Sequence, residues 1–382
     1  MKILFLTYHG FEEASGISKK MLAQIKGLRQ NGHEVHVCSY DYAEDGSRCR
    51  FVDNKIIKNY GRGVIAGIWQ RMSYGSIADY CLSNDIDLVY SRSYQNASPW
   101  LVCMFSKLKK NGIHCVQEIP TYPYDMEFKG YPLDKKVELF IDKLFRHQLA
   151  TRMDAVVTFS DAKTIFGQRT INISNGVDLD VIPLHSPINP FTQDIHIIAV
   201  AEVHTWHGYD RFIHGMGEYY ITHPSRKIYF HIVGDVWEPE MNGSSRAPGF
   251  KTYINRYNIK DYVLFHGKLF GDQLTDVFNQ CCFAVGSLAR HRSGITRIKT
   301  LKNREYACRG IPFVYSECDS DFDQQPYVLK TPADESPIDI NKVIDFIDSH
   351  HFKPSDIRKT VEHLSWKFQM EEVIENLNIM TK

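Results

Sequence analysis

The chain has 382 residues, a length that favours two domains, and an apolar fraction of 43%, which is enough for two buried cores. Its 45 basic and 45 acidic side chains balance, so composition gives no electrostatic drive toward nucleic acid. The nine cysteines form no CxxC pair, and several lie in apolar runs, which indicates reduced thiols in a cytoplasmic protein. No apolar stretch of about 18 residues occurs, so no transmembrane helix is predicted.

Short apolar runs alternate with helical patterns in the first half, which predicts βαβ units, a parallel sheet and an α/β fold. The expected strands are Lys2–Tyr8, Glu34–Ser39, Asp87–Ser91, Ile113–Glu118 and Ala155–Ser160. In such sheets, ligands bind at the carboxyl ends of the strands.

The proline-bearing segment Asp178–Thr192 lacks periodicity and is interpreted as a linker. After it the alternation restarts, with strands expected at Ile195–Ala201, Ile228–Gly234, Tyr262–His266, Phe283–Ser287 and Pro312–Ser316. The sequence therefore predicts one Rossmann-like domain over residues 1–182 and a second over 183–353. The helical pattern of residues 354–382 is expected to pack back on the first domain.

Several motifs in this order resemble glycosyltransferase family 4. They are KILFLTYHG, NGHEVHV, INISNGVDLD, VAEVHTWHGYDRFI, HIVGD, VLFHGKL and LKNREYACRGIPFV, and residues 118–124 are similar to a branch of bacterial surface-polysaccharide synthesis. The resemblance implies a GT-B fold, with two Rossmann-like domains facing across a cleft. It also implies retaining transfer from a nucleotide diphosphate sugar to a glycan or lipid-linked glycan acceptor, without a cofactor or catalytic metal. Capsule, exopolysaccharide and lipopolysaccharide synthesis are the processes concerned.

Three positions depart from the family. Glu202 and His207 stand where its members carry an arginine and a lysine on the donor diphosphate, and Arg297 replaces the first of two glutamates. The second glutamate corresponds to Glu305, which the resemblance assigns to the donor ribose. A helix-surface pair with Lys302 or Arg309 is the alternative for Glu305.

A departing diphosphate requires hydrogen-bond donors and cations. The loop around Gly16 and the turn at Gly294 and Ile295 are candidate backbone donors. His291, Arg292, Arg297, Lys299 and Lys302 follow one another closely, and Arg292 and Lys302 are the preferred phosphate ligands. His204 and His207 join them at the donor site, with His207 expected to be protonated. The predicted catalytic residues are His207, Arg292 and Lys302.

Carboxylates and aromatic faces bind sugars, and Glu118, Tyr122, Tyr124 and Asp125 follow a predicted strand. They are the candidate acceptor site; a proline-stiffened connection with packed tyrosines is the alternative. Asp319, Asp321 and Asp323 resemble the metal-binding acids of the other glycosyltransferase fold, GT-A, but a solvated loop is favoured.

Three other functions stay open: a GT-A enzyme, a nucleotide-sugar epimerase of GT-B fold, and a glycosyltransferase-like partner protein without activity. The segment Arg62–Tyr74 combines apolar and basic residues, as a helix on the inner face of the cytoplasmic membrane would. Packing of that helix on its own sheet is the alternative.

Overall fold

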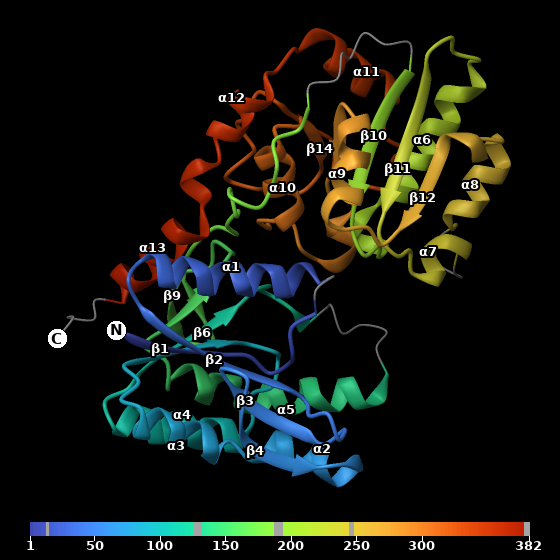
Figure 1. Ribbon diagram of the computed structural model, residues 1–382. Coiled ribbons are helices and arrows are strands. Elements are labelled where there is room, and N and C mark those ends of the chain that lie inside the picture. The colour runs from blue at the N-terminus through green and yellow to red at the C-terminus, as the bar shows by residue number, and fades with distance from the viewer. Residues whose placement is uncertain (13–14, 126–131, 187–193, 244–247, 378–382) are drawn as a thin grey trace. The chain divides into compact units, whose positions relative to one another are not determined.

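The computed structural model describes residues 1–12, 15–125, 132–186, 194–243 and 248–377 (Figure 1). The chain divides into two compact units. Unit 1 comprises Met1–Ser174 with Trp366–Lys382, and unit 2 comprises Asn175–Ser365. The chain passes from one unit to the other before residue 182, and residues 187–192 of the expected linker lie outside the described residues.

Unit 1 is built on a mixed sheet with the strand order β4-β3-β2-β1-β5-β6-β7-β9-β8. The central pairs are parallel, whereas β2–β3, β3–β4 and β8–β9 are antiparallel. The strands are β1 (Lys2–Leu6), β2 (Glu34–Tyr42), β3 (Arg48–Val52), β4 (Lys55–Gly61), β5 (Leu88–Arg92), β6 (His114–Ile119), β7 (Ala155–Thr158), β8 (Thr164–Ile165) and β9 (Gln168–Asn172).

The helices of unit 1 are α1 (Gly16–Gln30), α2 (Gly63–Met72), α3 (Gly75–Ser83), α4 (Pro99–Lys110), α5 (Leu133–Ala150) and α13 (Trp366–Asn376). Helix α13 packs on α1 so closely that a Cβ on Gly27 would lie 2.6 Å from the carbonyl oxygen of Trp366. The last helix of the described chain therefore belongs to unit 1, although the residues before it belong to unit 2.

Unit 2 contains a sheet in the order β12-β11-β10-β13-β14-β15, in which every pair of neighbouring strands is parallel. Its strands are β10 (Asp194–Val200), β11 (Lys227–Val233), β12 (Val263–Gly267), β13 (Phe283–Val285), β14 (Phe313–Tyr315) and β15 (Val328–Lys330). The α-helices are α6 (Tyr209–Ile221), α7 (Glu238–Asn242), α8 (Phe250–Tyr257), α9 (Gly271–Gln280), α10 (Leu301–Arg309), α11 (Ile340–Ser349) and α12 (Pro354–Lys359). The 3-10 turns are η2 (Thr205–His207), η3 (Lys260–Tyr262), η4 (Arg290–Ser293) and η5 (Glu362–Leu364).

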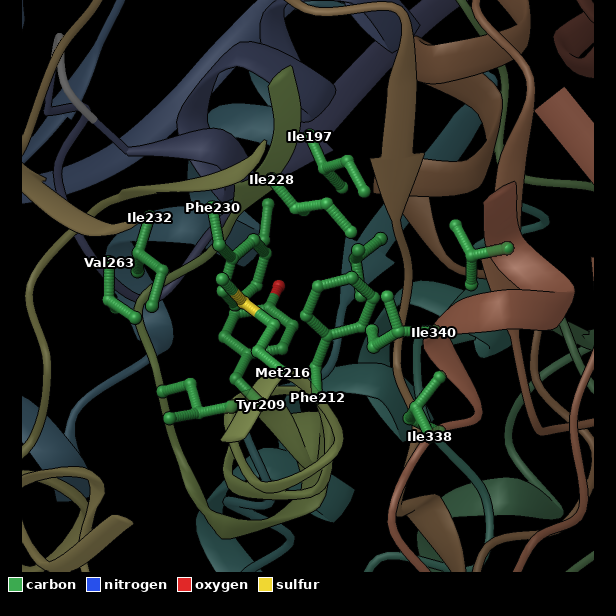
Figure 2. Close-up of a cluster of buried hydrophobic side chains, with 14 of the residues drawn as sticks. Ile197, Tyr209, Phe212, Met216, Ile228, Phe230, Ile232, Val263, Ile338 and Ile340 are labelled. Carbon is green, nitrogen blue, oxygen red and sulfur yellow. The ribbon is translucent and has the colours of Figure 1, made fainter. Parts of the chain in front are cut away.

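The core of unit 2 lies between this sheet and helices α6 and α11. Figure 2 shows Tyr209, Phe212 and Met216 of α6 against Phe230 of β11 and Ile340 of α11, all of them buried. The apolar strands β10 and β11 are covered because a parallel sheet buries both of its faces.

The α/β prediction is confirmed, and all ten expected strands are present within a few residues. The sequence analysis missed β3, β4, β8, β9 and β15. Strands β3 and β4 form a hairpin whose turn residues Asp53 and Asn54 have φ values of +48° and +65°. This turn lacks the Asn-Gly or Asp-Gly pair that marks such hairpins in sequence.

Three histidines form a hydrogen-bonded ladder across β10, β11 and β12. His196 Nδ1 lies 2.8 Å from His231 Nε2, and His231 Nδ1 lies 3.0 Å from His266 Nε2. Burial, together with the two neighbouring imidazoles, lowers the pKa of His231 to about 4. As long as the His231 ring is neutral, one of its nitrogens donates a hydrogen bond and the other accepts one.

We predict that acid destabilises unit 2 through this ladder. Because the folded pKa lies below the unfolded value of about 6.5, the unfolded chain binds the proton first, and stability present above pH 6.5 is lost as pH falls toward 4. Replacing His231→Phe should reduce the loss between pH 7 and 5 by about 2 kcal/mol, measured by urea unfolding. The control is His350→Phe, outside the ladder. Equal losses in the two variants would contradict the prediction.

Candidate functional site

The candidate site of unit 2 lies at the carboxyl ends of β10, β13 and β14. Strand β10 pairs with β11 on one side and β13 on the other, so the strand order reverses here, which is where open α/β sheets bind ligands. Leu288 N–H donates to the carbonyl of His207 at 2.9 Å, and Ser316 N–H donates to that of Ser287 at 3.0 Å. These hydrogen bonds connect the loops that follow β10, β13 and β14.

Gly208 allows the loop after β10 to approach the loop after β13. Its φ of +64° lies in the left-handed region, and a Cβ there would lie 2.7 Å from Cβ of Ala289. Both constraints require glycine between η2 and α6.

Glu317, directly after β14, is the most unusual group of the site. Its residue is 1% exposed, and within the described part of the chain neither carboxylate oxygen has a hydrogen-bond partner. Burial raises the pKa of Glu317, while Arg290 and Lys302 oppose the rise. A buried carboxylate normally has partners, so Glu317 marks these loops as the candidate site of unit 2.

Lys302, near the start of α10, is the cation facing Glu317. Burial, followed by the charge of Arg290, lowers the pKa of Lys302 to about 7, and Glu317 acts in the opposite direction. Its ammonium lies 3.4 Å from the hydroxyl of Tyr209, a long contact for a hydrogen bond. The predicted phosphate ligand Lys302 thus lies in the same cluster as Glu317.

Other buried polar atoms on the segment from β13 to the first turn of α10 also have no hydrogen-bond partner among the described residues. They include Ser287 Oγ after β13, and Thr300 Oγ1 and Asn303 Oδ1 at the start of α10. Hydroxyl and amide groups of this kind hydrogen-bond to sugar hydroxyls or phosphate oxygens. Several buried polar atoms without a hydrogen-bond partner thus lie in the segments that follow β13 and β14.

His207 lies in this cluster but in a different charge state from the one expected. Burial, together with Lys302 and Arg290, holds its pKa well below the usual range. The backbone N–H of His204 donates to His207 Nδ1 at 2.9 Å, so the proton of the neutral ring is on Nε2. His207 is therefore neutral in the ligand-free protein, where Nε2–H is a donor, and its protonation beside a bound dianion stays a prediction.

The guanidinium of Arg292, in contrast, forms its hydrogen bonds with other groups of the protein. It holds both oxygens of Asp210 at 2.9 and 2.8 Å, the carbonyl of Thr205 at 2.9 Å, and Glu335. These contacts use all five N–H groups of the arginine. The prediction that Arg292 binds phosphate is therefore corrected: it cross-links η4 to α6 and to the loop before α11.

The turn at Gly294 is also engaged. Gly294 ends η4 at a φ of +72°, its N–H donates to His291 at 2.9 Å, and the N–H of Ile295 donates to Arg290 at 3.3 Å. Helix α10 starts only at Leu301. The predicted backbone phosphate donors Gly294 and Ile295 are thus already used within the protein.

Glu305 and His204 also have partners within the protein, but these use fewer of their hydrogen-bonding atoms than the partners of Arg292 do. Arg309 donates from Nε and Nη2 to a single oxygen of Glu305, Oε1, at 3.0 Å. His204 precedes η2 and stacks on Trp206 at 4.6 Å between ring centres. The alternative of an Arg309 pair for Glu305 is therefore present in the structure.

In unit 1 the predicted acceptor residue Glu118 is fully buried. Its carboxylate pairs with Lys20 at 3.1 Å and accepts from Gln24 and Tyr90, each at 2.6 Å. Although burial acts to raise it, the pKa of Glu118 is lowered by Lys20 and Arg92. The structure thus corrects the expectation of a sugar-binding Glu118: this carboxylate joins α1 to the sheet.

The remaining acceptor candidates contact the protein to different degrees. Tyr124 is buried and donates to Asp142 at 2.6 Å, and Asp125 pairs with Arg146 at 2.7 Å. Tyr122 is partly buried, with its ring edge-on to Phe166. The alternative of packed tyrosines thus holds for Tyr124, whereas Tyr122 keeps an exposed part.

Gly16 is the first residue of α1, and the side chain of Ser15 caps this helix by accepting from the N–H of Ser18 at 3.3 Å. A Cβ on Gly16 would meet nothing within 4 Å, so the protein itself does not require glycine here. Residues 13 and 14 of the same loop lie outside the described residues.

The acidic run after β14 is held by cations. Arg304 pairs with Asp319 at 2.6 Å and with Asp321, and Lys330 pairs with Asp323 at 2.7 Å. Arg304 and Asp319 are fully buried, so this run is neither the solvated loop that was favoured nor an open set of metal ligands.

Sequence reasoning missed Arg290, Ser287 and Glu317. The guanidinium of Arg290 lies 5.6 Å from the centre of the Trp206 ring. All three residues follow the ends of strands that were predicted, so their positions in the sequence carried the signal.

No protein-family model and no curated protein matches the sequence. Solved structures do. They include sucrose-phosphate synthase from Thermosynechococcus elongatus (TM-score 0.62, 13% identity, 98% of each chain covered). A trehalose-6-phosphate structure from E. coli with UDP-2-fluoro glucose matches at 0.61, with 11% identity over 100% of each chain. The catalytic domain of starch synthase IV from Arabidopsis thaliana, with ADP and acarbose, matches at 0.60, with 11% identity over 98% of each chain. The chain therefore has the GT-B fold, as predicted.

Proposed function

We propose that this protein is a retaining, metal-independent glycosyltransferase that uses a nucleotide diphosphate sugar bound to unit 2. The observation that carries the proposal is Glu317, a buried carboxylate without a hydrogen-bond partner, beside Lys302 at the strand-order reversal of a GT-B unit. The structural neighbours that were solved with UDP-2-fluoro glucose or with ADP support the ligand class.

Transfer leaves a diphosphate that gains negative charge in the transition state. Lys302 in its charged form and Nε2–H of His207 are the donors proposed for it, in place of the family's arginine and lysine. Glu317 then accepts from sugar hydroxyls, which provide the hydrogen bonds that its oxygens lack in the protein. Unit 2 is thus proposed as the donor unit.

Glu305 remains the proposed ribose ligand. Arg309 contacts Oε1 of this carboxylate, which leaves Oε2 for a ribose hydroxyl. The ion pair with Arg309 fixes the rotamer of Glu305, so the two roles are compatible.

The acceptor is proposed to be a glycan or lipid-linked glycan of a bacterial surface polysaccharide, with Tyr122 as the acceptor-side contact in unit 1. This keeps the protein in the cytoplasm, in peripheral contact with the inner face of the membrane. No helix among the described residues is long and apolar enough to cross a bilayer.

A partner protein without activity is the second candidate. The exposed Glu202 and the fully engaged Arg292 favour it, because neither supplies the usual diphosphate cation. Incubation with a panel of nucleotide diphosphate sugars decides between the two: slow donor hydrolysis supports the transferase, whereas failure to bind any nucleotide supports the partner protein. Product formed from the donor sugar alone, without hydrolysis, would instead identify an epimerase.

We predict that the affinity for a nucleotide diphosphate falls as pH rises from 7 to 8.5. Since the pKa of Lys302 in the free protein is about 7, the cation is present below that pH and lost above it, by up to about tenfold in affinity per pH unit. Lys302→Arg should remove most of this dependence, because arginine stays charged. Calorimetric titration measures it, with Lys359→Arg as the control. A pH-independent affinity in the parent would exclude Lys302 from the phosphate site.

We also predict that Glu305→Ala weakens binding of the nucleotide diphosphate at least tenfold, because charge-assisted hydrogen bonds contribute about 1.5 to 3 kcal/mol. The exposed Glu362→Ala is the control. Melting is measured in parallel, because Arg309 is buried and loses its carboxylate partner in the Ala variant. An affinity within twofold of the parent would show that Glu305 is not the ribose ligand.

A further inference from the structure

Helix α2 presents its apolar side chains outward. Val64 is 81% exposed, Ile65 71%, Ile68 53% and Trp69 59%, and Ala66 is the buried residue of this helix. The alternative that this segment packs its apolar side on the sheet is therefore contradicted.

Helix α5 also exposes a row of apolar side chains. Its exposed apolar residues recur at i, i+4, i+7, i+8 and i+11, which places them along one stripe of the helix. They are Leu133 (77%), Val137 (50%), Phe140 (62%), Ile141 (37%) and Leu144 (56%). Leu139 and Asp142, on the opposite side, are buried.

The two helices are neighbours. Arg71, at the end of α2, pairs with Glu138 of α5 at 2.7 Å, and Figure 1 shows both helices in the same part of unit 1. Their exposed apolar residues together are called the two-helix face. Large apolar side chains gathered in this way on a water-exposed surface mark a site of interaction.

The surroundings of the two-helix face are basic. Residues 48–74 contain six basic side chains and one acidic side chain, although the whole chain has no net charge. Of the six, Arg50 is buried, and Arg62 and Arg71 pair with Asp45 and Glu138. Arg48, Lys55 and Lys58 are the others. Lys55 and Lys58 are exposed on β4, next to α2. An anionic partner is therefore favoured.

We propose that unit 1 docks on an anionic phospholipid surface through the two-helix face, with Trp69 and Phe140 inserted among the lipids and the basic residues at the headgroups. A second copy of this chain fits less well, because a two-fold interface would bring the same basic border against itself. The proposal names the lipid charge and the surface behind the membrane contact of the proposed function, but its evidence is the surface alone.

The test is co-sedimentation with vesicles in the absence of any nucleotide. The full chain should bind vesicles of phosphatidylcholine mixed with phosphatidylglycerol, bind pure phosphatidylcholine at least tenfold more weakly, and dissociate at high salt. Trp69→Ser with Phe140→Ser should weaken binding at least tenfold. The matched control, Trp237→Ser with Phe270→Ser, removes equally exposed aromatic residues from unit 2 and should bind like the parent.

The second part of the test reverses the charge of two basic residues next to the two-helix face. Lys55→Glu with Lys58→Glu should weaken binding to the anionic vesicles and leave the weak binding to phosphatidylcholine unchanged. Equal binding by all variants, or a parent that ignores anionic vesicles, overturns the proposal. A dimer in solution that the Trp69 and Phe140 changes dissociate would assign the face to a second copy instead. Donor hydrolysis without vesicles is measured separately, so failure of the transferase proposal would be distinguishable.

Discussion

The structural ion pairs of this protein and its candidate site differ in how the free-energy cost of burying a charge is offset. Arg304 with Asp319, and Lys20 with Glu118, are buried pairs whose atoms meet each other within 3.1 Å. Removing one member of such a pair leaves a buried charge and costs about 3 to 5 kcal/mol. Glu317 is equally buried, yet its oxygens lack hydrogen bonds in the described structure. Arg290 and Lys302 compensate part of its charge, and a proton or a ligand can compensate the rest.

Partial neutralisation explains why the cluster at the carboxyl ends of β10, β13 and β14 is stable without ligand. Burial lowers the pKa of Lys302 and raises that of Glu317, so both charges are weakened in the free protein. His207 is neutral for the same reason, with Lys302 adding to the effect. An incoming anion favours the charged form of Lys302, so its binding is expected to take up a proton. This arrangement differs from a permanently charged arginine and lysine pair, because ligand affinity becomes dependent on pH.

The α/β class and the positions of ten strands could be predicted from the sequence because apolar periodicity reports burial directly. The site could be predicted only in part. Lys302 was found in a run of basic residues three positions before Glu305, and His207 because it stands where the resembling family has a lysine. Arg292 had the same signal, but its partners Asp210 and Glu335 are 82 and 43 residues away, and no local pattern shows that they neutralise it. Glu118 was misassigned for the same reason, since Lys20 is 98 residues from it in the chain.

The outward apolar stripe of α5 shows a further limit of sequence patterns. An amphipathic helix is normally expected to bury its apolar side, yet α5 is held by Asp142, which accepts from the backbone N–H of Ala97 at 3.0 Å and from Tyr124 at 2.6 Å. Rotating the helix to bury Phe140 would break both bonds and expose Leu139. The orientation of α5 is thus set by a buried polar contact together with the burial of Leu139, Leu149 and Ala150. Its exposed stripe is therefore a stable feature of unit 1, maintained at a cost in exposed apolar area that an external apolar partner would offset.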